Sequence, residues 1–139
     1  MPVQSDYIWD PLRKKSVRQT PEEEVRQWFI SVLETGMKVP RHLMMSEVSL
    51  HLGQKEFRAD IVVYDRSAQP LMVVECKRPE VPLTQEVVDQ AIRYNRVLDV
   101  RYIVITNGIR TFMFVRDGEG FSFVEKAPLY EEMLCSQSG

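Results

Sequence analysis

Two carboxylates and one amine stand on two neighbouring predicted strands. Asp60 opens the first of two runs rich in β-branched residues, and Glu75 and Lys77 end the second. The six residues between the runs, 65–70, carry the polar residues and the proline of a turn, so the two runs predict an antiparallel hairpin. Side chains alternate along a strand, so Glu75 and Lys77 share one face while Cys76 points to the other. We expect the three charged groups to converge at one end of a sheet.

This combination of side chains suits a hard divalent cation. Mg2+ often takes only one or two protein carboxylates and keeps water and a phosphate as its other ligands. A neighbouring lysine can orient the attacking water and offset the charge that builds up on a phosphoryl group. The chemistry predicted is metal-assisted phosphodiester hydrolysis. The plainer alternative is that Glu75 and Lys77 form an ordinary ion pair at a sheet edge, which contributes under ~1 kcal/mol to stability.

Length and composition indicate one soluble domain. The chain has 139 residues, of which 44% are hydrophobic and 27% charged, and its formal net charge is -2. This charge argues against a strongly basic surface that would hold nucleic acid by electrostatics alone. The two cysteines, Cys76 and Cys135, form no CxxC or Cys/His cluster, which predicts neither a disulfide framework nor a zinc site. No signal peptide or membrane span is expected, and the cytoplasm is the expected compartment.

The order of predicted elements is helix, three strands, helix and further strands. Residues 1–19 show no periodicity and are interpreted either as a solvated arm or, through a basic cluster at 13–15, as a phosphate-contacting arm. Thr20 is predicted to cap a helix whose apolar stripe ends near Gly36. Strands are expected at 47–52, 55–64, 71–77, 101–106, 111–115 and 121–124, and helices at 84–98 and 128–134. Asn107-Gly108 predicts a two-residue hairpin turn. The stripe of the first helix consists of Val25, Trp28, Phe29, Val32 and Leu33.

These elements predict an α/β (α+β mixed) fold. A crossover helix joins strands that are expected to be parallel neighbours, which gives a mixed sheet flanked by helices with an αβββαβ core and an extra C-terminal β-hairpin. The predicted organisation is an N-terminal arm over 1–19, a single domain over 20–135 and a frayed tail over 136–139. On the first helix, Glu22 continues the buried stripe, Glu23 lies at its margin and Glu24 points to solvent.

Four separated pieces of the chain together resemble a known nuclease superfamily. Asp60, then fourteen intervening residues, then Glu75-Cys76-Lys77, is similar to the D...(D/E)-x-K signature of the PD-(D/E)XK superfamily, with Ala59 in place of the eponymous proline. The run Gln90 to Tyr94 resembles the Q-x-x-x-Y element of RecB-like nucleases. The stretch 20–111 most resembles the N-terminal nuclease domain of type I restriction enzyme R subunits, of which the tracts 73–79 and 105–108 are typical.

The resemblance implies a restriction-endonuclease-like core and Mg2+-dependent DNA hydrolysis, with Mn2+ able to substitute. Asp60 and Glu75 would hold the metal, with the backbone carbonyl of Cys76 and a first-helix acid, Glu22 rather than Glu23, in support. Lys77 would position the attacking water, and Gln90 and Tyr94 would shape the pocket. The cations expected to contact nucleic acid are Arg26, Arg58 and Arg78.

The sequence leaves the assembly and the activity of this chain open. The sequence contains no G-x-x-x-x-G-K-[ST] phosphate loop, so it is not a complete restriction motor subunit. It would act alone, as a homodimer, or with restriction-modification or helicase partner chains. The competing hypothesis is a catalytically inactive module that keeps the nuclease fold and binds nucleic acid or protein.

Overall fold

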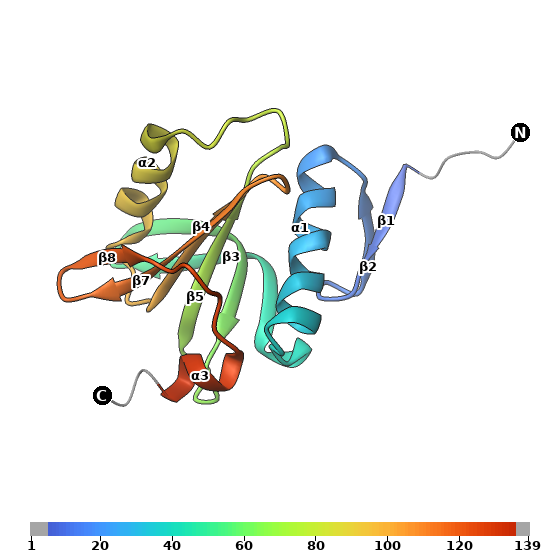
Figure 1. Ribbon diagram of the computed structural model, residues 1–139. Helices are drawn as coiled ribbons and strands as arrows, with labels where there is room; N and C mark the ends of the chain where they lie inside the picture. Colours follow the sequence, from blue (N-terminus) through green and yellow to red (C-terminus); the bar gives the residue numbers. More distant parts are fainter. Residues whose placement is uncertain (1–5, 136–139) are drawn as a thin grey trace, which may run out of the picture.

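A six-stranded mixed sheet forms the centre of the molecule, and the computed structural model describes residues 6–135 (Figure 1). The strands follow one another in space in the order β3-β4-β5-β6-β7-β8. β5 and β6 run parallel, and every other neighbouring pair in this sheet is antiparallel. The strands are β3 (Met44–Leu52), β4 (Lys55–Tyr64), β5 (Pro70–Cys76), β6 (Tyr102–Thr106), β7 (Thr111–Asp117) and β8 (Gly120–Phe123).

Two helices flank this sheet on opposite sides, and a threonine caps the N-terminus of each, as predicted for Thr20. α1 (Pro21–Ser31) continues into a short π-helical turn, Val32–Gly36, and the Thr20 hydroxyl accepts a hydrogen bond of 3.0 Å from the backbone N–H of Glu23. α2 (Gln85–Asn95) is capped in the same way by Thr84. A 3-10 turn (Arg41–Leu43) leads into β3, and α3 (Tyr130–Cys135) ends the described chain. No described helix has the length and apolar character needed to span a bilayer.

The parallel pair confirms the predicted crossover. The β5 and β6 strands pair from Met72 with Tyr102 to Cys76 with Thr106, and α2 lies in the connection between them. Short hairpins cannot join parallel strands, so a helix must return the chain to the starting end of the sheet. This connection places α2 over one face, while α1 and α3 lie on the other (Figure 1).

Apolar side chains fill both interfaces. On the α1 side, Val25 and Phe29 pack with Ile61, Val63, Val74 and the α3 residues Tyr130 and Met133. On the α2 side, Val88 and Ala91 pack with Ile105. A third group, which includes Phe57, Ala59, Val62 and Leu98, lies beside α2, where the rings of Phe57 and Tyr94 are 5.1 Å apart.

The N-terminal segment differs from the expectation. Residues Tyr7–Asp10 (β1) and Lys15–Arg18 (β2) form an antiparallel hairpin outside α1, where an irregular arm was predicted (Figure 1). Its few apolar residues give no clear alternation, because Tyr7 and Trp9 are exposed and only Val17 is a buried hydrophobic residue. Residues 1–5 and the tail predicted at 136–139 lie outside the described residues.

Three smaller predictions are wrong. β3 begins at Met44 rather than 47, because the Met pair joins the ladder with Val63 and Val62. Trp28 is 45% exposed and does not belong to the buried stripe of α1. The β6–β7 connection spans residues 107–110 instead of a two-residue turn, because the Asn107 side chain accepts hydrogen bonds from the N–H groups of Ile109 and Arg110.

Candidate functional site

A local reversal of side-chain direction places Asp60 beside α1. Phe57 and Ala59 of β4 pack on the α2 side, whereas Ile61 and Val63 pack on the α1 side, so the two-residue alternation breaks around Asp60. β3 has its own irregularity at the same level: Glu47, between the pairs Ser46–Ile61 and Val48–Ala59, has a φ of 50°. Asp60 therefore lies in the middle of β4, not at its start as predicted.

Both oxygens of the Asp60 carboxylate are engaged. Oδ2 accepts a hydrogen bond of 2.7 Å from the backbone N–H of Cys76, at the end of β5. Oδ1 accepts one of 3.1 Å from the guanidinium of Arg26. The first bond ties Asp60 to the end of β5, between Glu75 and Lys77 in sequence.

Glu75 and Lys77 open toward α2. Their charged groups form an ion pair with a distance of 3.0 Å between Lys77 Nζ and Glu75 Oε2. Together with Gln90 and Tyr94 of α2 they line a cavity of about 350 Å³. Four of the six predicted catalytic and supporting residues thus surround one cavity. Tyr94 is 40% exposed and stacks against Phe57, so its ring both packs and faces solvent.

Glu22 and Glu23 occupy different environments. Glu23 is the more buried of the two, contrary to the predicted faces, because it binds the guanidiniums of Arg13 and Arg26. Glu22 is half-buried, and burial, followed by the negative charge of Asp60, raises its pKa. Arg26 and Lys77 oppose this rise. The negative charge of Asp60 thus acts on Glu22, the first-helix acid predicted to support the metal.

Sequence reasoning missed an ion-pair network behind Asp60, here called the arginine–carboxylate cluster: Asp10, Arg13, Glu23, Arg26, Glu47 and Asp60. Glu23 Oε1 bridges Arg13, at 2.7 Å, and Arg26, at 2.6 Å. Glu47 bridges the same two arginines at 3.2 and 3.4 Å. Asp10, fully buried, binds Arg13 at one end, and Asp60 binds Arg26 at the other. Only the Glu23–Arg26 spacing of three residues on a helix hinted at a pair.

The three arginines predicted to contact nucleic acid differ in exposure. Arg58 and Arg78 are exposed, and Arg78 pairs with Glu80 at 3.1 Å. The side chain of Arg26 is 5% exposed and binds three carboxylates, so it belongs to the arginine–carboxylate cluster rather than to a surface. Burial alone would lower its pKa, but Glu23 and Asp60 outweigh this effect and the pKa rises. Arg13, from the predicted basic cluster, is likewise paired with acids.

The donor set is compatible with Mg2+. Among residues 6–135, no three acidic, histidine or cysteine side chains are already gathered into a metal-binding group. Mg2+ requires fewer, because one or two carboxylates with water and substrate oxygens suffice. Asp60 and Glu75 supply such carboxylates on strands joined by the Cys76 hydrogen bond. Burial and the Asp60 charge raise the pKa of the Cys76 thiol, so only the backbone carbonyl of this residue suits a hard cation.

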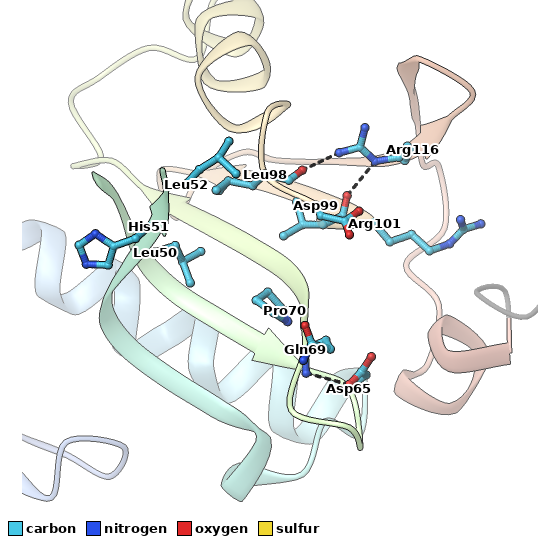
Figure 2. Close-up of a pocket in the computed structure, with 11 residues that line it drawn as sticks. Leu50, His51, Leu52, Asp65, Gln69, Pro70, Leu98, Asp99, Arg101 and Arg116 are labelled. Atoms are coloured by element: carbon cyan, nitrogen blue, oxygen red, sulfur yellow. Dashed lines mark hydrogen bonds between the residues drawn. The ribbon is translucent and has the colours of Figure 1, made fainter. Parts of the chain in front are cut away.

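A second cavity, of about 540 Å³, lies at the other end of the β4–β5 hairpin (Figure 2). Its wall includes Asp65 and Gln69 of the β4–β5 turn and Asp99 after α2. Arg116 also lines it, but its guanidinium donates to the carbonyl oxygens of Leu98, Val100 and Arg96 and so closes the end of α2. None of the predicted site residues borders this cavity, which makes it a useful place for control substitutions.

The mixed sheet, its order of strands and the crossover helix give a restriction-endonuclease-like fold of the PD-(D/E)XK type. Residues 21–128 match the family described as the type I restriction enzyme R protein N terminus. The chain belongs to this family. The N-terminal hairpin lies outside the matched residues.

Solved structures share the fold at low sequence identity. One is a fragment assigned to the HsdR subunit of a type I restriction enzyme from Vibrio vulnificus YJ016, with 20% identity and a TM-score of 0.60 over 87% of this chain and 26% of that one. Another is a protein assigned as a nuclease from Anabaena variabilis ATCC 29413, with 14% identity and a TM-score of 0.52 over 85% of this chain and 79% of that one. This chain thus spans about a quarter of the Vibrio fragment. No curated protein matches significantly.

Proposed function

We propose that this chain is a Mg2+-dependent nuclease domain that hydrolyses DNA phosphodiester bonds and leaves 5'-phosphates. The observation that supports it best is the cavity that Glu75 and Lys77 share with Gln90 and Tyr94, next to a strand on which the Cys76 N–H fixes Asp60. An ion pair needed only for stability would not account for this convergence. The family match supports a restriction-type nuclease domain.

In this proposal Asp60 and Glu75 hold the cation, with the Cys76 carbonyl and Glu22 in support. When bound, the cation would supply charge stabilisation to the phosphoryl group and acidify water. Lys77 orients the attacking water and offsets negative charge as it develops. Gln90 and Tyr94 are placed to contact a nucleotide group and a phosphate, and Arg58 and Arg78 to contact flanking phosphates. The R-protein family suggests partners from a restriction-modification system, and a homodimer is the alternative assembly.

Cleavage of plasmid and linear duplex DNA tests the proposal. In Mg2+ or Mn2+, Asp60→Asn, Glu75→Gln and Lys77→Ala should each reduce cleavage at least about a hundredfold, as losses of a metal ligand or charge-stabilising group do. Asp99→Asn in the second cavity is the matched control and should cut at the parent rate. Parent-like cleavage by Asp60→Asn and Lys77→Ala would refute the assignment.

One observation favours the inactive alternative. The Asp60 carboxylate is already bound by Arg26 and the Cys76 N–H, as in a site that has exchanged its metal for a fixed cation. Calorimetric titration with Mn2+ distinguishes the active nuclease from the inactive module. An active site should show binding that Asp60→Asn removes, whereas an inactive module should show no such binding.

A further inference from the structure

Arg26 occupies the position of a counter-ion to the candidate metal ligand. Its Nη2 lies 3.1 Å from Asp60 Oδ1, and its side chain, which projects from α1, is buried. A guanidinium at this oxygen repels a divalent cation. It also occupies lone pairs of the oxygen that a metal ion would need. Because Arg26 stays charged, this opposition persists across the pH range in which the protein is folded.

The arginine–carboxylate cluster gives Arg26 other partners. The same guanidinium contacts Glu23 at 2.6 Å and Glu47 at 3.4 Å. Arg26 can therefore release Asp60 without becoming an unpaired buried charge, which would be strongly destabilising. The cluster as a whole contains four carboxylates and two guanidiniums, so it carries an excess of two negative charges. A divalent cation at Asp60 would neutralise this excess.

The backbone keeps Glu47 in a position to receive the guanidinium. Glu47 has a left-handed φ of 50°, which is unfavourable for a residue with a side chain. This conformation occurs where β3 and β4 change side-chain direction, and its carboxylate reaches both Arg13 and Arg26. Arg13, anchored by the buried Asp10 of the hairpin, holds Glu23 and Glu47 from the other side.

We propose that Arg26 competes with the divalent cation for Asp60, and that Glu23 and Glu47 receive the guanidinium when the cation binds. Arg26 is thus a positioning residue that sets the cation concentration at which the site fills. This inference rests on the proposed function. It assigns a role to the hairpin as well, because Arg13 holds the two acids that accept the displaced guanidinium.

Isothermal titration of the full chain with MnCl2 tests the proposal. Arg26→Met should bind Mn2+ about tenfold more tightly, as expected when one nearby unit charge is lost, yet unfold at lower urea concentration than the parent. A residue that only supported the fold would lose stability and affinity together. Arg41→Met removes the exposed pair with Glu34 and is the matched control, with parent affinity expected. Equal or weaker binding by folded Arg26→Met overturns the proposal.

Two further variants test the proposal if Arg26→Met does not fold. The double variant Arg26→Met/Glu23→Gln removes both members of the tightest pair, and it too should bind more tightly than the parent. Glu47→Gln changes a half-exposed side chain, so circular dichroism should show a parent-like fold; it should bind Mn2+ more weakly because Arg26 keeps one acceptor fewer. Parent affinity in Glu47→Gln contradicts the proposal. If the parent binds no Mn2+, the proposed function fails first and this inference falls with it.

Discussion

Glu22 differs from the other acids in the first turn of α1 because it faces another carboxylate. Burial and the Asp60 charge raise its pKa above the ordinary value of 4.5, so the folded state binds its proton more tightly than the unfolded state does. The stability that this proton contributes is complete below the unfolded pKa and is lost as pH rises through the folded pKa. Ionised Glu22 thus lowers the free energy of unfolding of the metal-free protein at neutral pH. A bound cation would offset this loss.

Glu22→Gln should remove this cost. The difference in free energy of unfolding between the variant and the parent should grow in favour of the variant as pH rises from about 4 to about 7. Urea unfolding at several pH values without divalent cations measures it. Glu24→Gln, an exposed acid one position beyond Glu23, is the control and should show no such trend. The same difference at every pH in Glu22→Gln would contradict the electrostatic explanation.

Ser46 carries a buried hydroxyl with no hydrogen-bond partner among the described residues. Burying an unpaired hydroxyl is unfavourable, so Ser46→Ala should raise the free energy of unfolding by up to about 1 kcal/mol. Ser49→Ala is the comparison, because the Ser49 hydroxyl donates to Glu56 at 2.7 Å on an exposed part of β3. Urea denaturation of both variants gives the two values, and a clear loss of stability in Ser46→Ala would show that the hydroxyl is paired.

At the scale of elements, the hairpin depends on charge more than on apolar burial. Asp10 is fully buried and accepts hydrogen bonds from Arg13 and the Leu12 N–H, and the net effect of these groups is to lower its pKa despite the opposing effect of burial. Its contribution to stability is present above the unfolded value of 3.8 and is lost as pH falls through the folded pKa.

Asp10→Asn should therefore loosen the hairpin and cost about 1–3 kcal/mol, as expected when a charged hydrogen-bond acceptor is lost. Hydrogen exchange of the β1 and β2 amides should accelerate, with little change in β4 and β5. Asp117→Asn, at the exposed turn end of the β7–β8 hairpin, is the control and should change stability by less than about 0.5 kcal/mol. Unchanged exchange in Asp10→Asn would show that the hairpin is held by other contacts.

The central elements follow from local pattern, whereas the missed ones depend on distant partners. Apolar runs, the cap Thr20 and the helix between the third and fourth predicted strands predict the sheet and its helices. They also bring Glu75, Lys77, Gln90 and Tyr94 together, because strand ends and helix faces have fixed geometry. The hairpin and Glu47 escaped prediction because charge pairs between remote residues, rather than periodicity, hold them.

At the scale of the whole molecule, net charge limits DNA affinity. The chain carries a formal charge of -2, and Arg13 and Arg26 are paired with acidic side chains inside the protein. Phosphate neutralisation supplies most non-specific affinity, so a net negative charge implies weak binding. Fluorescence anisotropy with a labelled duplex at physiological salt and without divalent cations should give a Kd above about 10 μM. A submicromolar Kd would reveal a basic surface that the pairings do not suggest.

The route of the chain between β5 and β6 separates two kinds of side chain. The strands carry Asp60 and Glu75, and Lys77 follows β5 directly, while Gln90 and Tyr94 belong to α2, which crosses outside the sheet. Chimaeras that exchange residues 85–95 with the corresponding helix of a relative would leave the strand ladder untouched. The crossover is thus a separate segment in which substrate preference could diverge while the groups proposed to perform hydrolysis stay fixed.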